Sequence, residues 1–153
     1  MKLSKNLSLL ECTKSNTARR LNIDNTPSEA VIDSLKLIAQ KVFQPLRDYY
    51  NLPIGVSSGY RSQELNKAIG GSKTSQHCKG EALDLDADIY GGLTNKQIFD
   101  YIKDNLEFDQ LIWEYGDDKT PDWVHVSYKK ENNRLQVLRC ERVNGMSQYA
   151  IHT

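Results

Sequence analysis

The stretch Ser75-Gln76-His77-Cys78-Lys79-Gly80-Glu81-Ala82-Leu83-Asp84 decides how this chain of 153 residues is organised around its candidate site. Residues 81–87 alternate between polar and apolar side chains, which predicts a half-buried strand. Asp84 then points to one face of that strand, and its two leucine neighbours point to the other. Gly80 permits a tight turn before the strand, because glycine accepts backbone angles that other residues resist. His77 is therefore expected in a polar loop that leads into the strand carrying Asp84.

A second short phrase, Asp122-Trp123-Val124-His125, follows later in the chain. Residues 123–128 alternate in the same way, so His125 is also expected on a strand. Together His77, Asp84 and His125 offer two imidazoles and one carboxylate. This is the ligand set of an open zinc site, in which three protein ligands leave a fourth position for water. The sequence therefore predicts a bound Zn²⁺, with two of its ligands on rigid strands.

The string Ser75-x-His77-x-x-Gly80-x-Ala82-x-Asp84, with the later Asp122-x-x-His125, resembles the zinc D-Ala-D-Ala metallopeptidases. That family includes D,D-carboxypeptidases, D,D-dipeptidases and phage endolysins that cut L-Ala-D-Glu bonds. The segment Ser57-Ser58-Gly59-Tyr60-Arg61-Ser62 also resembles the family segment that carries an active-site arginine. The resemblance covers roughly residues 30–130. It implies a hedgehog/D,D-peptidase-like fold and a peptidoglycan stem peptide as substrate, with D-residues at or near the cut.

Four further residues are expected to act on the substrate or on the water. Asp122 lies three residues before His125, and we expect it to be the base that takes the proton of the water, although it could also be a simple turn residue. Many members of the resembling family have Glu at that position. Arg61 is expected to meet a substrate carboxylate or a developing oxyanion, with Tyr60 beside it, although it could also be a surface ion-pair residue. Ser75 either binds substrate or only shapes its loop.

Other residues with similar chemistry are interpreted as structural. Cys78 is expected to be a packed or half-exposed thiol that points away from the zinc. Asp86 and Asp88 are expected to be solvated strand residues or to support the ligands from outside. Glu114 follows an apolar strand and is expected either to support the zinc ligands from outside or to be a rival base that ranks after Asp122. His152 is expected to lie in a frayed tail.

The composition favours a small enzyme that binds neither nucleic acid nor membrane. Lys plus Arg and Asp plus Glu both number 20, so the formal net charge is zero and nothing favours an anionic partner surface. The N-terminal residues have no long apolar run, so we expect neither a secretory signal nor a transmembrane helix.

The three cysteines, Cys12, Cys78 and Cys140, are odd in number and far apart, which argues against a disulfide framework and for synthesis in a reducing cytosol. We expect a monomer made in the cytoplasm without a signal peptide. Acting on the cell wall, it would be phage-encoded, released at lysis or exported by an unusual route.

The remaining sequence predicts a scaffold of helices followed by strands. The expected elements are a short helix over residues 6–20, a helix opened by the capping box Thr26-Pro27-Ser28-Glu29, a strand over 54–57, a helix from Ser62 to Ile69, a helix from the capping box at 94–97 to about Leu106, and strands near 110–114, 123–128 and 135–139. The second of these helices is expected to kink or to end early at Pro45. This order predicts an α+β fold with a central, mainly antiparallel sheet and flanking helices. All 153 residues are expected to form a single zinc peptidase domain, with its motif-bearing core at about residues 30–140.

Three functions of this fold remain open from the sequence, beside a hydrolase of a different amide such as an ordinary peptide. The first is a zinc peptidase of D-Ala-D-Ala carboxypeptidase type that hydrolyses stem-peptide bonds next to D-amino acids. The second is an endolysin-like L-Ala-D-Glu endopeptidase. The third is a non-catalytic zinc-binding module of the same fold, which would have no need of Asp122 and Arg61.

Overall fold

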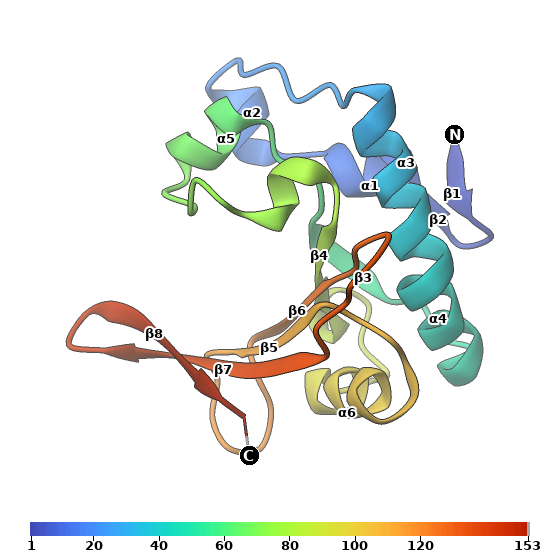
Figure 1. Cartoon of the computed structure of the whole chain (residues 1–153), viewed down its shortest axis with the longest axis vertical. Helices are drawn as coiled ribbons and strands as arrows, with labels where there is room; N and C mark the ends of the chain where they lie inside the picture. Colours follow the sequence, from blue (N-terminus) through green and yellow to red (C-terminus); the bar gives the residue numbers. More distant parts are fainter. Residues whose placement is uncertain (153) are drawn as a thin grey trace.

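The computed structural model of the chain describes residues 1–152 and combines helices with one large sheet (Figure 1). The helices are α1 (Leu9–Thr13), α2 (Asn16–Arg20), α3 (Glu29–Ile38), α4 (Gln44–Tyr50), α5 (Gln63–Ala68) and α6 (Asn95–Asn105), with a π-helical segment at Ala39–Phe43 and 3₁₀ turns at Gln76–Lys79 and Ala87–Ile89. The strands are β1 (Lys2–Ser4), β2 (Leu7–Ser8), β3 (Gly55–Ser58), β4 (Ala82–Asp86), β5 (Gln110–Glu114), β6 (Trp123–Ser127), β7 (Gln136–Val143) and β8 (Met146–Ile151). Within residues 1–152, no helix is long and apolar enough to cross a bilayer.

The main sheet has the strand order β3-β4-β6-β5-β7-β8, and β1 pairs with β2 separately. All neighbours in the main sheet are antiparallel except β5 and β7, which run parallel. The predicted α+β fold with a mainly antiparallel sheet is therefore confirmed. Strands β7 and β8 extend beyond the rest of the sheet as a two-stranded ribbon (Figure 1).

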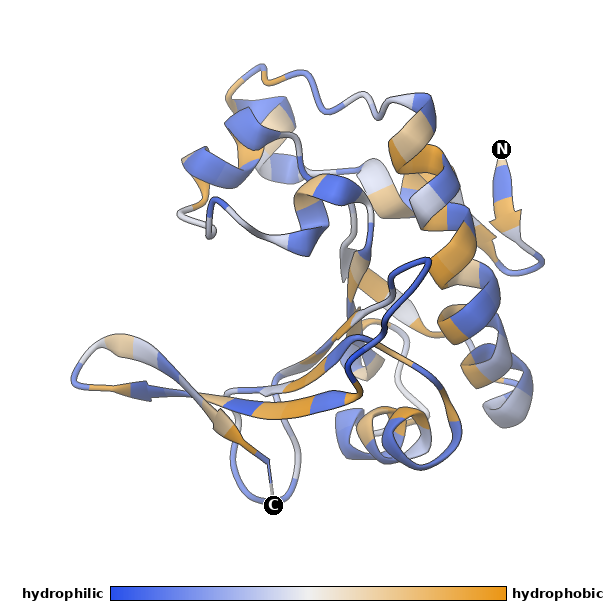
Figure 2. Cartoon of the chain, in the orientation of Figure 1, coloured by the Kyte–Doolittle hydropathy of each residue, from blue (hydrophilic) through white to orange (hydrophobic). Residues whose placement is uncertain are grey.

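One face of the sheet forms the hydrophobic core against α6. Ile98, Phe99 and Ile102 of α6 are fully buried, and the ring of Phe99 meets Trp113 of β5 edge to face at 5.2 Å. Figure 2 shows the apolar side of α6 turned toward the strands. Burying each such side chain contributes about 1.5–3 kcal/mol. Because side chains alternate along a strand, the opposite face of the same strands is left free to carry polar groups.

Capping explains where the two long helices begin. In α6, Thr94 and Gln97 form the predicted reciprocal capping box. In α3, the cap is Ser28, whose Oγ accepts a hydrogen bond from the N–H of Val31. The expected start of this helix at Thr26 was therefore two residues too early.

Near Pro45, where a kink or an early end was expected, the helix contains a wide helical turn. The helix does not end there, but passes through the π-helical segment at Ala39–Phe43 and continues as α4. The N–H of Gln44 bonds to the carbonyl of Ala39, five residues earlier. Since proline has no N–H and its ring crowds the carbonyl four residues earlier, the wider turn accommodates it.

The two ends of the chain differ from expectation. The single helix expected over residues 6–20 is broken into α1 and α2, because Lys14 is extended and Ser15 caps a new helix. The tail is not frayed, since strand β8 follows β7 and the N–H of His152 bonds to the carbonyl of Val137. The ring of His152 lies 4.9 Å from that of Phe99, so this histidine packs near the core.

Candidate metal centre

Two neighbouring strands and one 3₁₀ turn bring His77, Asp84 and His125 together. Asp84 of β4 lies directly opposite His125 of β6, and His77 belongs to the 3₁₀ turn Gln76–Lys79. One carboxylate oxygen of Asp84, Oδ1, lies 3.3 Å from His77 Nε2 and 3.1 Å from His125 Nδ1. One ligand atom from each residue lies within 4.8 Å of the other two. Among the described residues 1–152, this is the one group of three or more such side chains that could hold a metal ion.

Backbone contacts orient the ring of His77. Its Nδ1 lies 2.6 Å from the carbonyl oxygen of Gly59, which can only accept, so Nδ1 carries the proton and donates. Nε2 is the ring nitrogen that is directed at Asp84, and it is the one left to bind a metal, as in metal sites where the other ring nitrogen of a histidine is held by a carbonyl. The carbonyl of His77 in turn accepts a hydrogen bond from the N–H of Arg61 at 3.1 Å. These contacts fix the ring independently of any metal.

The three donors fit a divalent metal ion in their chemistry and in their burial. His77 is 2% exposed, and the side chains of Asp84 and His125 are 14% and 12% exposed. Burial alone would raise the pKa of Asp84, but the adjacent imidazoles of His77 and His125 hold this pKa below its ordinary value. Asp84 is therefore a carboxylate at neutral pH. Two imidazole nitrogens and one carboxylate oxygen form an open ligand set of the kind that zinc accepts.

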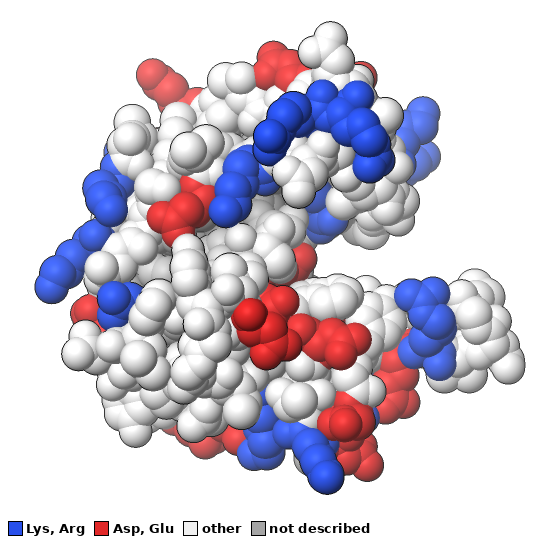
Figure 3. Space-filling model, turned by 180° about the vertical axis from the view of Figure 1, so that it is seen from behind, with Lys and Arg blue, Asp and Glu red and all other residues white. Residues whose placement is uncertain are grey.

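The three residues lie in a cleft of about 810 Å³. Its floor is the polar face of the sheet, where His125, Ile112 of β5 and Leu138 of β7 form one row across the strands. Glu114 lies in the neighbouring row on one side of His125, and Gln110 lies in the row on the other side. The candidate ligands thus lie part-way along the cleft. In Figure 3 the molecule is notched between its helical part and the ribbon.

Glu114 faces the cleft from the end of β5. It lies directly opposite Trp123 of β6, and both share the sheet face of His125, which is two residues after Trp123. Glu114 is only 7% exposed. Burial raises the pKa of its carboxyl to about 7, with His125 opposing the rise and the carboxylate of Asp84 adding to it. A carboxyl group with a pKa near neutrality can both accept and return a proton.

The structure does not bring Asp122 to the cluster. Asp122 is exposed and does not line the cleft. Its N–H donates to the carbonyl of Glu114 at 2.9 Å, and its carbonyl accepts from the side chain of Asn95 in α6 at 2.9 Å. The physical reason is the period of two in a strand, which turns a residue three positions before His125 away from the face of His125. This corrects the expected placement of Asp122 beside the ligands.

The other predicted site residues lie around the cleft in different ways. Arg61 is half-buried and lines it, and its Nε is buried with no hydrogen-bond partner among the described residues. Ser75 also lines the cleft, and its Oγ accepts a hydrogen bond from the N–H of His77 at 3.2 Å, so it does shape the turn. Tyr60 lines a neighbouring cavity of about 470 Å³, which it shares with Arg61, and does not line the main cleft.

Two parts of the cleft were not anticipated from the sequence. Ser147 and Tyr149 of β8 contribute to one wall, and Lys129 and Arg134 line the cleft beyond the end of β6. No local motif marks these positions, because their places depend on how β7 and β8 pair with the sheet. Glu114 was expected as a rival base because it follows an apolar strand, and its place two residues after Ile112 on β5 puts it on the face of His125.

Comparison with known proteins agrees with this arrangement. A family model described as Peptidase M15 matches residues 5–127, which is well over half of the chain. The match contains the three candidate ligands and Glu114. No curated protein matches the chain. Peptidases of this family depend on a metal ion, and the cluster of His77, Asp84 and His125 could hold one. The chain belongs to the peptidase M15 family.

Proposed function

We propose that this protein is a zinc-dependent peptidase that hydrolyses stem-peptide bonds of peptidoglycan next to D-amino acids. The observation that carries the proposal is the cluster of His77, Asp84 and His125 in one cleft with the buried carboxyl of Glu114, in a chain of the peptidase M15 family. In this proposal the three clustered residues hold Zn²⁺. When bound, zinc supplies a Lewis acid that polarises a carbonyl group and acidifies a water molecule.

Glu114 is the proposed base in place of Asp122. Its position in the row next to His125 supports this assignment, as does a pKa near neutrality. A base in this position takes a proton from the attacking water and returns it to the leaving amine. Asp122 is exposed outside the cleft lining and has no part in this scheme.

Arg61 is proposed to stabilise negative charge on the substrate. Its Nε is buried without a partner among residues 1–152, so a buried donor is available to a carbonyl oxygen or an oxyanion. The hydrogen bond from its backbone N–H to the carbonyl of His77 ties its position to that of a ligand. Ser75 lines the same cleft, where its hydroxyl can contact the substrate.

The bond that is cut has two candidate forms. A D-Ala-D-Ala carboxypeptidase would release the terminal D-Ala, whereas an endopeptidase would cut within the stem, for instance at L-Ala-D-Glu. The cleft lining continues on both sides of the ligand row, to Glu114 on one side and to Gln110 on the other. Room on both sides favours a substrate that continues past the cleaved bond. We therefore propose endopeptidase activity as a second candidate, next to carboxypeptidase activity.

Digestion of purified muropeptides by the zinc-loaded protein tests the proposal. Mass spectrometry of the fragments should find stem peptides shortened at one specific bond. Loss of a single alanine indicates the carboxypeptidase form, and internal fragments indicate the endopeptidase form. If zinc binds and no muropeptide is cut, the proposed activity is wrong and the non-catalytic zinc module is the better account.

A further inference from the structure

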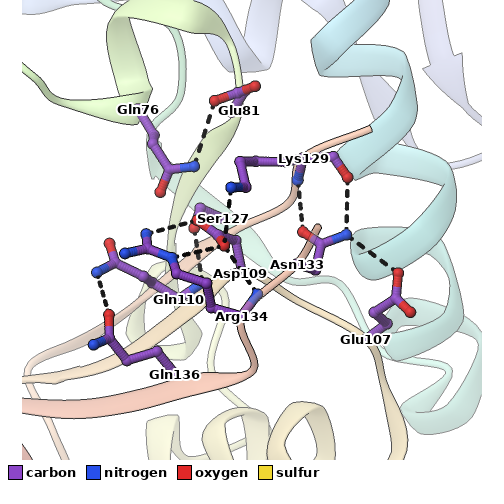
Figure 4. A network of polar contacts seen from close by, with 10 residues as sticks. All are labelled: Gln76, Glu81, Glu107, Asp109, Gln110, Ser127, Lys129, Asn133, Arg134 and Gln136. Atoms are coloured by element: carbon purple, nitrogen blue, oxygen red, sulfur yellow. Dashed lines mark hydrogen bonds and ion pairs between the residues drawn. The ribbon is translucent and has the colours of Figure 1, made fainter. Parts of the chain in front are cut away.

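A second polar cluster lies in the cleft, outside the candidate metal centre. It consists of Asp109, Lys129 and Arg134, all of which line the cleft (Figure 4). Asp109 immediately precedes β5, while Lys129 and Arg134 belong to the segment between β6 and β7. This segment follows the part of the chain that matches the family model, which ends at residue 127.

Asp109 holds the guanidinium of Arg134 in one orientation. Its two carboxylate oxygens accept from Arg134 Nε at 3.0 Å and from Arg134 Nη2 at 2.8 Å. Asp109 is completely buried, whereas the side chain of Arg134 is 51% exposed. Burial would raise the pKa of Asp109, but the hydrogen bonds and charge of Arg134, with the charge of Lys129, lower it to about 2. The bidentate pair therefore keeps one edge of the guanidinium on Asp109 and leaves the remaining N–H groups exposed.

The cluster has more positive than negative charge. Arg134 and Lys129 are both cationic, and the ammonium of Lys129 lies 3.7 Å from the same carboxylate of Asp109. One carboxylate thus faces two cations, which leaves one positive charge without a contacting carboxylate. A buried carboxylate needs one cation to balance its charge, so the burial of Asp109 does not by itself explain a second cation. A cationic group held in a fixed orientation at a cleft is instead suited to bind an anion.

The cluster lies on the opposite side of the ligand row from Glu114. The N–H of Asp109 donates to the carbonyl of Ser127, which is two residues after His125 on β6. Two residues along a strand span about 7 Å, so the cluster begins about that far from the ligand row. This spacing suits a peptide whose cleaved bond lies at the ligands and whose neighbouring residue carries a carboxylate.

We propose that Arg134, oriented by Asp109 and assisted by Lys129, binds a free carboxylate of the substrate close to the cleaved bond. This inference rests on the proposed peptidase function and deepens it, because it makes a carboxylate-bearing stem peptide the preferred substrate. A stem peptide offers such a group in two places, the C-terminus of D-Ala-D-Ala and the α-carboxylate of D-Glu. The two sources share their chemistry and are separated by the choice of peptide.

The test compares each acid with its amide in steady-state hydrolysis. One peptide pair ends in D-Ala-D-Ala as the free acid or the amide, and the other carries D-Glu or its α-amide. The wild type should have a lower KM for the acid of the pair whose carboxylate reaches Arg134. Arg134→Gln should raise that KM roughly 10- to 100-fold, since a charged hydrogen bond contributes about 1.5–3 kcal/mol. Its kcat and its KM for the amide should change little. The backbone N–H of Arg134, which also bonds to Asp109, is retained in this variant.

Arg139→Gln is the matched control. Arg139 is also ion-paired, with Asp118 and Glu141, but it lies outside the cleft lining. The Arg139→Gln variant should keep the wild-type difference in KM between the acid and the amide peptide. The inference is overturned if the wild type has the same KM for acid and amide in both peptide pairs. It is also overturned if Arg134→Gln raises KM equally for the acid and the amide.

Binding to the metal-free protein separates this inference from the proposed activity. The resonance of the exposed guanidinium N–H groups of Arg134 should shift when an acid peptide is added and should stay in place with its amide. If this shift occurs while no peptide is cut by the zinc-loaded protein, the carboxylate site stands and the proposed activity fails. If the peptides are cut and the resonance does not respond, the activity stands and the carboxylate site fails.

Discussion

Asp84 of β4 lies directly opposite His125 of β6, and its Oδ1 lies 3.1 Å from His125 Nδ1. The same oxygen lies 3.3 Å from His77 Nε2, so one carboxylate joins both imidazoles. A slip of one residue between the two strands would move one of the partners to the core face. The candidate metal centre therefore depends directly on the register of β4 and β6, which the buried leucines beside Asp84 maintain.

Removal of one ligand should abolish tight metal binding. We expect the wild type to bind about one zinc per chain and His77→Ala to lose most of it, because only two donors remain. His152→Ala is the control, since His152 packs near Phe99 and does not belong to the cluster. Elemental analysis after dialysis measures the zinc that the wild type and each variant retain. Full zinc occupancy in a variant lacking both His77 and His125 would show that the metal binds elsewhere.

Glu114 and Asp122 should differ sharply when each is made neutral. Glu114→Gln should keep zinc and lower kcat by roughly two to four orders of magnitude, because a positioned base contributes about that much. Asp122→Asn should keep near wild-type kcat, since its side chain is exposed outside the cleft lining. Muropeptide turnover under saturating substrate measures this difference. The opposite ranking of the two variants would return the role of base to Asp122.

The metal-free protein should lose stability as the pH rises through the range in which Glu114 ionises. Folding raises the pKa of Glu114 from 4.5 to about 7, so the folded state holds this proton more tightly. Its contribution to stability is full below pH 4.5 and is lost as the pH approaches 7. Relative to Glu114→Gln, the wild type should lose at most about 3 kcal/mol over this range, because one pKa unit corresponds to about 1.4 kcal/mol. Urea unfolding at several pH values, with chelator present, measures this loss. A difference in the free energy of unfolding between the wild type and Glu114→Gln that stays the same at every pH would contradict the prediction.

Gly59→Ala should weaken both the fold and the metal centre. A Cβ at Gly59 would lie 2.8 Å from the Cα of Cys12, so the chain must shift there. The shift should cost about 1–3 kcal/mol, as overpacking commonly does. It should also lower zinc affinity, because the carbonyl of Gly59 holds Nδ1 of His77.

Gly145→Ala serves as the control for Gly59→Ala. No heavy atom lies within 4 Å of the Cβ position at Gly145, although its φ of +79° makes alanine strained. We expect a loss of about 1–2 kcal/mol in the free energy of unfolding and no change in zinc affinity. Equal zinc affinity in Gly59→Ala and the wild type would show that the carbonyl contact does not orient His77.

The sequence by itself determined the elements that follow from local patterns. Alternation of polar and apolar residues correctly predicted the strands that carry Asp84 and His125, because side chains on a strand have a period of two. Thr94 and Ser62 correctly marked the starts of α6 and α5, because a side chain that caps a helix bonds within a few residues of itself. The α+β class followed from the order of these elements. All of these features depend on contacts between residues that are close in the sequence.

Only the tertiary structure decided which polar side chains share the cleft. Glu114 reaches the face of His125 because β5 pairs with β6 in one register, whereas Asp122 is turned away by its odd distance from His125. Asp109 meets Arg134 because the segment after β6 returns beside the start of β5. Strand β8 completes one wall by pairing with β7. Pairing between strands depends on packing across the whole core, so it could not be predicted from the local sequence pattern.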